Sequence, residues 1–304
     1  MVELRLFRYF IAVAEELHFG RAAEKIGIAQ PPLSQQIQVL ERELGVRLFD
    51  RTNRKVELTD AGMALLGEAR KALAAADYAV EEARRAGRGQ VGRLAIGMVG
   101  SITYQEMIPE VIRTFRERYP NVAIHLQECS TPQQVEAIRR GELHIGFVRP
   151  PVSDHLVKFE TVMRESMVLA LPASHPFASR KRIAIKELAN EPWITLPPGL
   201  GLGFYEQVMN LCAKAGFQPS LSQVAVQMHT MLSLVAGGLG VTVVPESVSH
   251  ADRKGIVYVE IAGATPPVET AAAYLKTNRS PILGNFLKIL RGVSSERQST
   301  PLLA

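Results

Sequence analysis

The first part of the chain carries apolar residues at helical spacing, separated by short turns. A helix over residues 3–16 is predicted from one apolar stripe, formed by Leu6, Phe7, Phe10, Ile11 and Ala14. A second, shorter helix is expected over 21–26, with Gly20 as its N-cap. A tight turn at 27–29 leads into a third amphipathic segment. Two short helices joined by a tight turn are typical of a helix-turn-helix.

The third segment, AQPPLSQQIQVLERELG at 29–45, predicts a helix that begins at its prolines. The first N–H groups of a helix have no intrahelical acceptor, so we expect Pro31 at the cap and Pro32 as the first helical residue. One face is apolar, with Leu33, Ile37, Leu40 and Leu44, and Gly45 ends the helix. The opposite face carries Gln35, Gln38 and Arg42, with Ser34 at its edge.

This polar face suits the major groove of DNA, because a glutamine amide can bond both N6 and N7 of adenine. A solvated face of an ordinary amphipathic helix is the alternative.

Residues 46–58 predict a β-hairpin, or wing, around residues 52–54. The wing is basic, with Arg47, Arg51, Arg54 and Lys55. Beside a recognition helix, Arg54 would enter the minor groove while Arg51 and Lys55 hold phosphates. Residues 1–60 contain nine Lys and Arg and nine Asp and Glu, so the placement of charge, and not its total, supports DNA binding. A solvated basic loop is the alternative.

Residues 60–86 predict the longest helix, with Thr59 as its cap. Its apolar seam alternates spacings of three and four, as in a two-stranded coiled coil: Leu66, Ala69, Leu73, Ala76, Val80 and Ala83. Pairing of two chains along this seam is favoured because a dimer reads two half-sites. Packing of the seam on the chain's own body is the alternative. The glycine- and arginine-rich stretch at 83–93 predicts a flexible domain boundary.

From residue 94 onward, strand and helix patterns alternate. Strands at 94–99, 122–128 and 144–148 are separated by helices near 104–119 and 131–140, which predicts a parallel sheet with covered faces. A second set of strands and helices occupies 167–245. A strand at 268–276 and a helix near 281–292 resume the first pattern. We therefore expect two α/β lobes, with lobe I at about 91–162 and 267–295 and lobe II at about 163–266.

Candidate ligand-binding residues follow the predicted strands or open the predicted helices, where anions bind in α/β folds. They are Ser101, Thr103, Thr131, Arg149, Phe204 and Met228. Hydroxyls, one arginine and an apolar wall suit a small, partly apolar carboxylate held between the lobes. As alternatives, Ser101 and Thr131 cap helices, and Arg149 forms an interlobe salt bridge.

Composition narrows the class of protein. The 304 residues carry a formal net charge of +5, which permits a polyanionic partner without requiring one. No apolar run approaches the roughly 20 residues of a membrane span, and no secretory signal is present, so we expect a cytoplasmic protein with no membrane partner. Cys129 and Cys212 are expected as reduced thiols in apolar cores.

Catalytic and metal-binding motifs are missing from the sequence. GLGLG at 199–203 lacks the lysine of a phosphate-binding loop, and the histidines are scattered. We expect no cofactor, no metal and no catalytic residue, and therefore not an enzyme. The polar tail at 296–304 is expected to be disordered.

The amino-terminal residues resemble the signature of LysR-type transcriptional regulators in their order and spacing. The matching residues are the aromatic first helix, Ala22-Ala23, Gln30-Pro31-Pro32-Leu33-Ser34, Glu41, Leu44-Gly45, Leu48-Phe49, Arg51, Leu58-Thr59 and Gly62. The resemblance implies a winged helix-turn-helix in which Gln30, Pro31, Pro32, Ser34, Gln35 and Arg54 contact DNA. At Phe19-Gly20 the sequence departs from the many members that carry Ser or Thr as the cap of the second helix.

Resemblance to the same family also covers the larger part of the chain. It implies a long dimerising linker helix and a two-lobed effector domain similar to bacterial solute-binding proteins, and the stretches near 99–101 and before Phe204 look most like the subgroup that governs breakdown of aromatic compounds. Ser101, Thr131 and Phe204 would then line the effector cleft.

The expected organisation is a winged helix-turn-helix at 1–58, a linker helix and hinge at 59–90, and an effector domain at 91–295. The expected function is a regulator that binds promoter DNA and responds to a small-molecule co-inducer. It would assemble as a dimer of dimers and activate transcription, with RNA polymerase as a further partner. The alternative is a small-molecule-binding protein or enzyme that uses the helix-turn-helix for oligomerisation.

Overall fold

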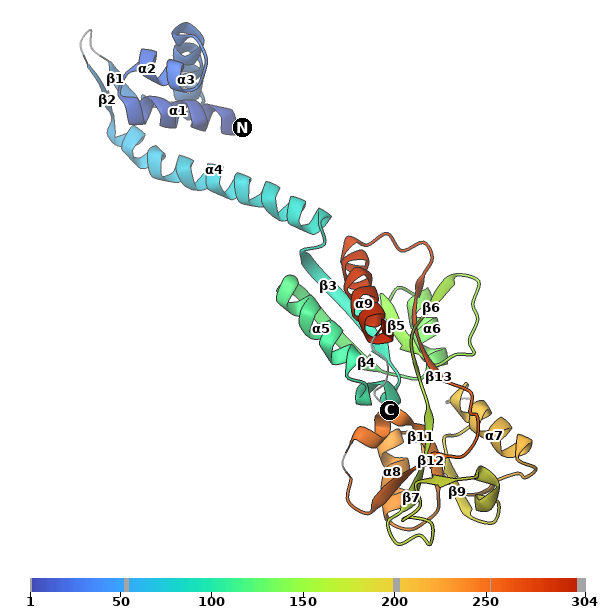
Figure 1. The fold of residues 1–304 in the computed structure, drawn as a ribbon. Helices are drawn as coiled ribbons and strands as arrows, with labels where there is room; N and C mark the ends of the chain where they lie inside the picture. The colour runs from blue at the N-terminus through green and yellow to red at the C-terminus, as the bar shows by residue number, and fades with distance from the viewer. Residues whose placement is uncertain (1, 52–54, 199–202, 252, 300–304) are drawn as a thin grey trace. The chain divides into compact units, whose positions relative to one another are not determined.

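The fold was analysed in a computed structural model, which describes residues 2–51, 55–198, 203–251 and 253–299, with the side chains of 298 and 299 left out. The chain divides into two compact units, Met1–Arg85 and Ala86–Ala304 (Figure 1). Each unit has its own hydrophobic core, and the larger unit consists of two lobes. Within the described ranges, no helix is both long and apolar enough to cross a membrane.

Three helices and a hairpin form most of the first unit: α1 (Leu4–Glu16), α2 (Phe19–Lys25), α3 (Gln30–Leu44), β1 (Phe49–Arg51) and β2 (Val56–Leu58). The two strands pair antiparallel, with Phe49 opposite Leu58, so the predicted wing is confirmed. Phe10 of α1, the apolar stripe of α3 and Phe49 of the wing are buried in one core. The recognition helix and the wing are therefore held to each other by packing.

Two helix starts differ from the sequence-based expectation. α2 begins at Phe19, and its N-cap is His18, whose Nδ1 accepts a hydrogen bond from the backbone N–H of Arg21 at 3.2 Å; Gly20 is not the cap. An imidazole here does what Ser or Thr does at many N-caps. α3 begins at Gln30 with Ala29 as N-cap, so both prolines lie inside the first turn, where no backbone N–H is needed.

The long helix α4 (Asp60–Gly87) follows the wing directly. Thr59 caps it as predicted: its Oγ1 accepts from the N–H of Gly62 at 3.0 Å and donates to the Arg47 carbonyl at 2.8 Å. A Cβ at Gly62 would lie 2.2 Å from the Leu48 carbonyl oxygen, so the glycine permits the close approach of helix and wing. Ion pairs from Arg70 to Glu15 and from Asp77 to Arg8 attach α4 to α1.

The first lobe of the larger unit is built on a five-stranded sheet of order β4-β3-β5-β13-β6. Its strands are β3 (Val91–Met98), β4 (Asn121–Glu128), β5 (Ile145–Val148), β6 (Val157–Glu165) and β13 (Val268–Leu275). β4, β3 and β5 are parallel, as predicted, whereas β13 runs antiparallel to both β5 and β6. The sheet is therefore mixed and includes β6, which the sequence analysis did not predict.

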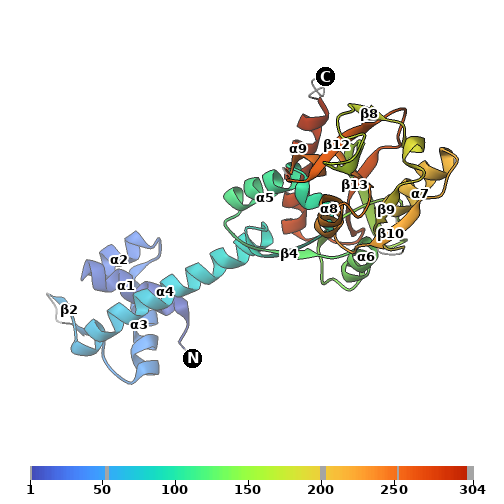
Figure 2. The ribbon, with the colours of Figure 1, turned by 90° about the horizontal axis from the view of Figure 1, so that it is seen from below.

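Helices cover both faces of this sheet. α5 (Met107–Arg118) and α9 (Pro281–Ser299) lie side by side and share one core with the sheet, whereas α6 (Thr131–Arg139) packs on a separate cluster at the other face (Figures 1 and 2). A short 3₁₀ helix, η1 (Gly100–Tyr104), precedes α5. α9 continues through residues 296–299, where Arg297 bonds Glu110 at 2.8 Å, so this part of the expected disordered tail is helical. Residues 300–304 lie outside the described ranges.

The second lobe contains a four-stranded sheet and a two-stranded sheet. The first has the order β11-β7-β12-β8 and the second pairs β10 with β9 in parallel. Their strands are β7 (Met167–Pro172), β8 (Arg182–Ile183), β9 (Pro192–Thr195), β10 (Ser220–Val224), β11 (Thr242–Pro245) and β12 (Ile256–Ile261). A bridge from Trp193 to Val241 joins the two sheets. The helices are α7 (Phe204–Lys214) and α8 (Met228–Ala236), with short 3₁₀ turns η2 (Ile185–Leu188) and η3 (Glu246–His250).

The chain crosses between the lobes twice. It leaves the first sheet at the end of β6, at Glu165 and therefore later than 162, and it returns at the start of β13, at Val268. Glu165 and Val268 are partners in the register of these two neighbouring strands. Both crossings therefore leave the sheet side by side, at its β6 edge.

Candidate functional site

α3 separates structural side chains from exposed ones along its length. Leu33, Ile37 and Leu40 are fully buried, as the pattern predicted, although Leu44 at the last turn is 37% exposed. The predicted contact face is free of the core: Gln30, Pro31, Pro32, Gln35 and Gln38 are exposed and Ser34 is half-buried. These side chains extend over the first three turns of the helix, and that is the length of a surface that can enter a major groove.

The wing is attached to α3 through one carboxylate, that of Glu41. Its Oε1 accepts from the backbone N–H of Leu48 at 2.9 Å and of Phe49 at 3.3 Å, and its Oε2 bonds Arg51 at 2.9 Å. The Arg51 guanidinium also lies 4.8 Å from the centre of the Phe19 ring. Arg51, predicted as a phosphate contact, therefore has a structural role within the unit.

The other predicted wing residues are Lys55, which forms an ion pair with Glu57, and Arg54, which lies outside the described residues. Lys55 is exposed directly before β2.

The predicted dimer seam on α4 divides into two parts. Ala69 is fully buried in the core of its own unit, and Leu66 packs partly on that core, so Ala69 is wrongly assigned to the dimer contact. Further along, Leu73 and Ala76 are half-buried and Val80 is 51% exposed. The exposed stripe available to a second chain therefore begins near Leu73.

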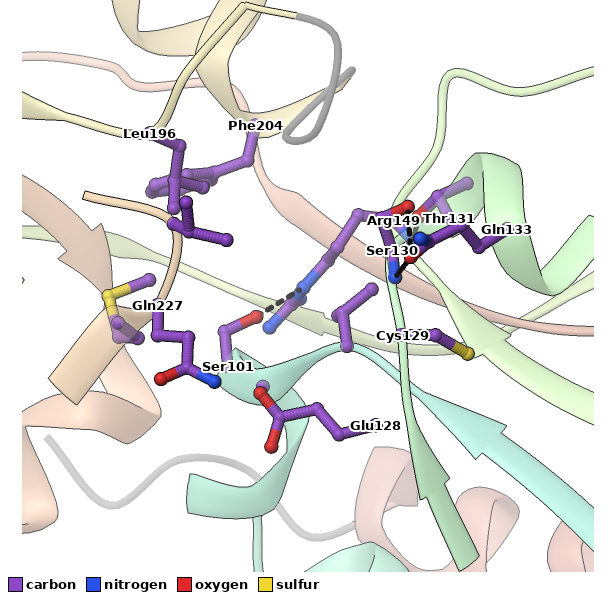
Figure 3. Close-up of a pocket in the computed structure, with 14 residues that line it drawn as sticks. Ser101, Glu128, Cys129, Ser130, Thr131, Gln133, Arg149, Leu196, Phe204 and Gln227 are labelled. Carbon is purple, nitrogen blue, oxygen red and sulfur yellow. Dashed lines mark hydrogen bonds between the residues drawn. The ribbon is translucent and has the colours of Figure 1, made fainter. Parts of the chain in front are cut away.

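The larger unit contains a cavity of about 380 Å³ between its lobes (Figure 3). From the first lobe it is lined mainly by polar side chains, among them Ser101, Glu128, Ser130, Thr131, Gln133 and Arg149. From the second lobe the lining is mostly apolar, with Leu196, Phe204, Val226, Gln227 and Met228. The volume suits a ligand of the size of a small aromatic acid.

Five of the six predicted ligand-binding residues line this cavity, and Thr103 does not. Thr103 is exposed on η1, and its hydroxyl donates to the Gly100 carbonyl at 2.7 Å. The prediction for Thr103 is therefore wrong, because the chain turns into a 3₁₀ helix directly after β3 and directs this side chain away from the lining.

Three helices begin at the cavity: α6 at Thr131, α7 at Phe204 and α8 at Met228. The first N–H groups of a helix lack intrahelical acceptors, and the helix dipole adds partial positive charge. At α6 the side-chain Oε1 of Gln133 accepts from both the N–H and the hydroxyl of Ser130, which fixes the entry to the helix. The walls of the cavity can therefore bind an anionic group from either lobe.

Arg149 lines the cavity but is bonded within a buried network. Its Nη2 lies 3.0 Å from Glu165, its Nη1 lies 3.0 Å from the Thr270 hydroxyl, and its Nε lies 3.4 Å from the Ser101 hydroxyl. The Arg149 and Glu165 side chains are 6% and 5% exposed. Burial lowers the pKa of Arg149, and the neighbouring Glu165 carboxylate opposes that effect. Arg149 therefore forms an ion pair, but its partner Glu165 belongs to the same lobe's sheet, so the expected interlobe salt bridge is not observed, and Arg149 lines the cavity as well.

Glu165 connects the two lobes. Its Oε1 also accepts from the Gln105 amide at 2.6 Å, and its Oε2 accepts from the backbone N–H of Ser247, in the second lobe, at 2.8 Å. Sequence reasoning missed Gln105, Glu165 and Thr270, because nothing in a local pattern distinguishes a buried glutamate at a strand end from a surface one. It also missed Glu128, which the rule for carboxyl ends of parallel strands could have found.

The described lining offers little for covalent or acid–base catalysis. The described lining residues include one thiol, that of Cys129. Burial raises the pKa of this thiol, the charge of Glu128 raises it further, and the thiol therefore stays protonated. The arrangement is suited to binding a ligand between the two lobes, so that binding can change the position of one lobe relative to the other.

Known sequences and structures agree with this description. The profile of the "LysR substrate binding domain" matches residues 87–295, and that of the "Bacterial regulatory helix-turn-helix protein, lysR family" matches 4–63. The HTH-type transcriptional regulator AlsR of Bacillus subtilis (strain 168) is 41% identical over 288 residues, which cover 95% of each chain. The Hca operon transcriptional activator HcaR of Escherichia coli (strain K12) is 37% identical over 290 residues, covering 95% of this chain and 97% of its own.

A solved structure extends the similarity to the whole fold. Full-length CbnR in complex with its target DNA superposes with a TM-score of 0.85 at 30% identity, covering 96% of this chain and 100% of CbnR. The similar proteins are named as regulators and not as enzymes. From the two matched domains and this similarity along the whole chain, we conclude that the protein belongs to the LysR family of DNA-binding transcriptional regulators with an effector-binding domain.

Proposed function

We propose that α3 reads promoter DNA through its exposed face and that the wing holds the adjacent backbone. The residues in contact with DNA would be Gln30, Pro31, Pro32, Ser34, Gln35 and Gln38, with Arg51, Arg54 and Lys55 at the wing. The observation that carries this function is the division of α3 into a side with the fully buried Leu33, Ile37 and Leu40 and a side with exposed amides. The amides can discriminate bases, whereas charge alone would bind any sequence.

The effector would be a small carboxylate, bound in the cavity between the lobes. The first N–H groups of three helices and the Ser101 hydroxyl can bind its anionic group, and Leu196 and Phe204 form an apolar wall. An aromatic acid fits this division, and control of genes for breakdown of aromatic compounds is the corresponding role. The domain limits at 58 and 90 belong to the same proposal.

Assembly would proceed through the exposed part of the α4 seam, at Leu73, Ala76 and Val80, to a dimer and then to a dimer of dimers. Two recognition helices would dock on two half-sites about one helical turn apart. Effector binding would change how the chains bend the DNA, with a coupling of roughly 1–3 kcal/mol, and would recruit or activate RNA polymerase. Because the target is promoter DNA, the cytoplasm is the proposed location.

Fluorescence anisotropy with the DNA upstream of the protein's own gene and of its neighbouring gene tests this function. We expect binding that depends on sequence and weakens with salt, and that changes in affinity or footprint when aromatic acids are added. Equal affinity for promoter DNA and for scrambled DNA of the same composition would contradict the proposal. Turnover of a bound acid would favour the enzyme alternative instead.

A further inference from the structure

Among the lining residues that the structure describes, two side chains besides the Cys129 thiol are ionisable, Arg149 and Glu128. The positive charge of Arg149 is paired with Glu165 at 3.0 Å, and both side chains are almost fully buried. Three further guanidinium N–H groups are directed at the Thr270 hydroxyl, the Glu269 carbonyl and the Ser101 hydroxyl. Arg149 therefore contributes little net charge to a ligand.

Glu128 differs from Arg149 in having no counter-ion. It is the last residue of β4 and is exposed, and neither an ion pair nor a hydrogen bond to its carboxylate occurs within the described ranges. Its register partner Met98 ends the neighbouring parallel strand β3, so Glu128 lies at the same sheet edge as Ser101. A Cβ at Gly100 would lie 2.6 Å from Glu128 Oε1, so the glycine leaves room for the carboxylate beside the lining.

Glu128 and Gln227 approach the same end of the cavity from different lobes. Figure 3 shows the Glu128 carboxylate and the Gln227 carboxamide near Ser101, whereas Ser130 and Thr131 at the start of α6 lie on the other side of the Arg149 side chain. The cavity thus has a carboxylate, that of Glu128, at one end and the first N–H groups of α6 at the other. A ligand that is only an anion would meet an uncompensated carboxylate, which is unfavourable.

We propose that the effector carries, besides its carboxylate, a hydrogen-bond donor that faces Glu128, as in a small hydroxy acid or amino acid. Glu128 then determines specificity: it accepts a hydrogen bond from a hydroxyl or ammonium group, and its charge weakens the binding of an acid that has no such donor. Hydrogen bonds to a charged acceptor contribute more than neutral ones, so the preference for the donor-bearing acid is about tenfold or more in Kd. This inference rests on the proposed function of the cavity.

Isothermal titration calorimetry of the full chain with matched acids tests the inference. One series is phenylpropanoate, phenyllactate and phenylalanine, and a second is benzoate, salicylate and anthranilate. Within a series the members share a skeleton and differ in having no donor, a hydroxyl or an amino group. We expect the parent protein to bind at least one donor-bearing acid about tenfold more tightly than its plain counterpart, and the better arm identifies the donor.

The variants Glu128→Gln and Glu142→Gln complete the test. Glu128→Gln removes the charge at the cavity and is expected to abolish the preference, while Glu142→Gln removes an exposed charge outside the lining and keeps it. Equal affinities within every series in the parent protein, or a preference that survives Glu128→Gln, would overturn the inference. If those acids still alter promoter binding, the proposed effector function is retained and only the role of Glu128 is rejected. If no acid binds at all, the role of Glu128 and the proposed effector function are both rejected.

Discussion

At the scale of single residues, Gln35 belongs to a helix whose other side is fixed in a core. Its neighbours Leu33 and Ile37 are fully buried, so the amide is presented on a rigid surface and needs little ordering when it meets DNA. A glutamine that bonds adenine in this way contributes base discrimination and not general affinity.

Gln35→Ala is therefore expected to weaken binding to the promoter by about 1–3 kcal/mol while leaving affinity for scrambled DNA almost unchanged. Anisotropy titrations at fixed salt measure both. Gln127→Ala, which removes an exposed glutamine in the other unit, is the matched control and should match the parent protein. A Gln35→Ala variant with unchanged promoter affinity would remove this residue from the interface.

Sequence reasoning predicted single residues well where a local rule applied and failed where distant parts of the chain meet. The apolar stripe of α3 and the Thr59 cap follow from spacing and capping chemistry, and both are observed. The ion pair joins Arg149, directly after β5, to Glu165 at the end of β6, and its existence depends on the order of strands in the sheet. His18 as a cap was missed because imidazole is an uncommon choice at that position.

At the scale of elements, α4 has a divided surface. Its first half, at Leu66 and Ala69, is attached to the first unit's core, and its second half carries the exposed stripe. A charge in the second half would be buried between two helices if the chains pair there, and burial of an unpaired charge is strongly unfavourable.

Under the proposed pairing, Val80→Asp is expected to shift the assembly towards monomer at micromolar concentration, as measured by sedimentation velocity. Ala75→Asp introduces the same charge on an exposed position of the same helix outside the seam and should not change the assembly. Identical sedimentation of both variants and the parent would place the dimer contact elsewhere.

A second prediction at this scale concerns Glu15, which joins three helices. Hydrogen bonds from Arg70 of α4 and then from Lys25 of α2 lower its pKa from the ordinary 4.5. Because the pKa is lower in the folded state, this stabilisation is complete above the unfolded pKa and is lost as the pH falls through the folded pKa.

Glu15→Gln should therefore lower the Tm at neutral pH, and the difference from the parent should shrink below about pH 4. Thermal unfolding at a series of pH values measures this. Glu24→Gln, at an exposed position of α2, provides the control and should give a small difference at every pH. A Glu15→Gln deficit that stays constant down to low pH would contradict the ionic origin.

Elements were the easiest level to predict, with informative exceptions. The parallel strands β3, β4 and β5 and the helices between them follow from clear alternation of apolar and polar runs. β6 was missed because its sequence, VKFETVMRE, mixes charged and apolar residues, as expected for a strand whose faces are only partly covered. β12 was also missed, although its sequence, IVYVEI, is apolar apart from one glutamate. The antiparallel direction of β13 is set by the return of the chain from the second lobe, which local pattern does not encode.

At the scale of the whole effector unit, Glu165 is bonded to both lobes at once. Its Oε1 accepts hydrogen bonds from Arg149 and Gln105, and its Oε2 accepts one from the backbone N–H of Ser247. Removing one member of a buried ion pair leaves the other charge uncompensated, so we expect Glu165→Gln to lower the free energy of unfolding of this unit by about 3 kcal/mol.

Urea denaturation followed by circular dichroism measures this change. Glu260→Gln breaks the exposed pair with Arg182 and is expected to lower the free energy of unfolding by less than about 1 kcal/mol. Similar losses in the two variants would mean that the network at the crossing contributes no more than a surface contact.

The pairing of Glu165 with Val268 also has a mechanical consequence. The two tethers between the lobes are neighbouring strands, about 4.8 Å apart, at one margin of a sheet. Two adjacent tethers resist sliding and twisting of one lobe against the other, but they can bend together. We therefore expect the lobes to swing about a single axis when a ligand enters, so that a small closure at the cavity becomes a larger displacement at the far end of the second lobe.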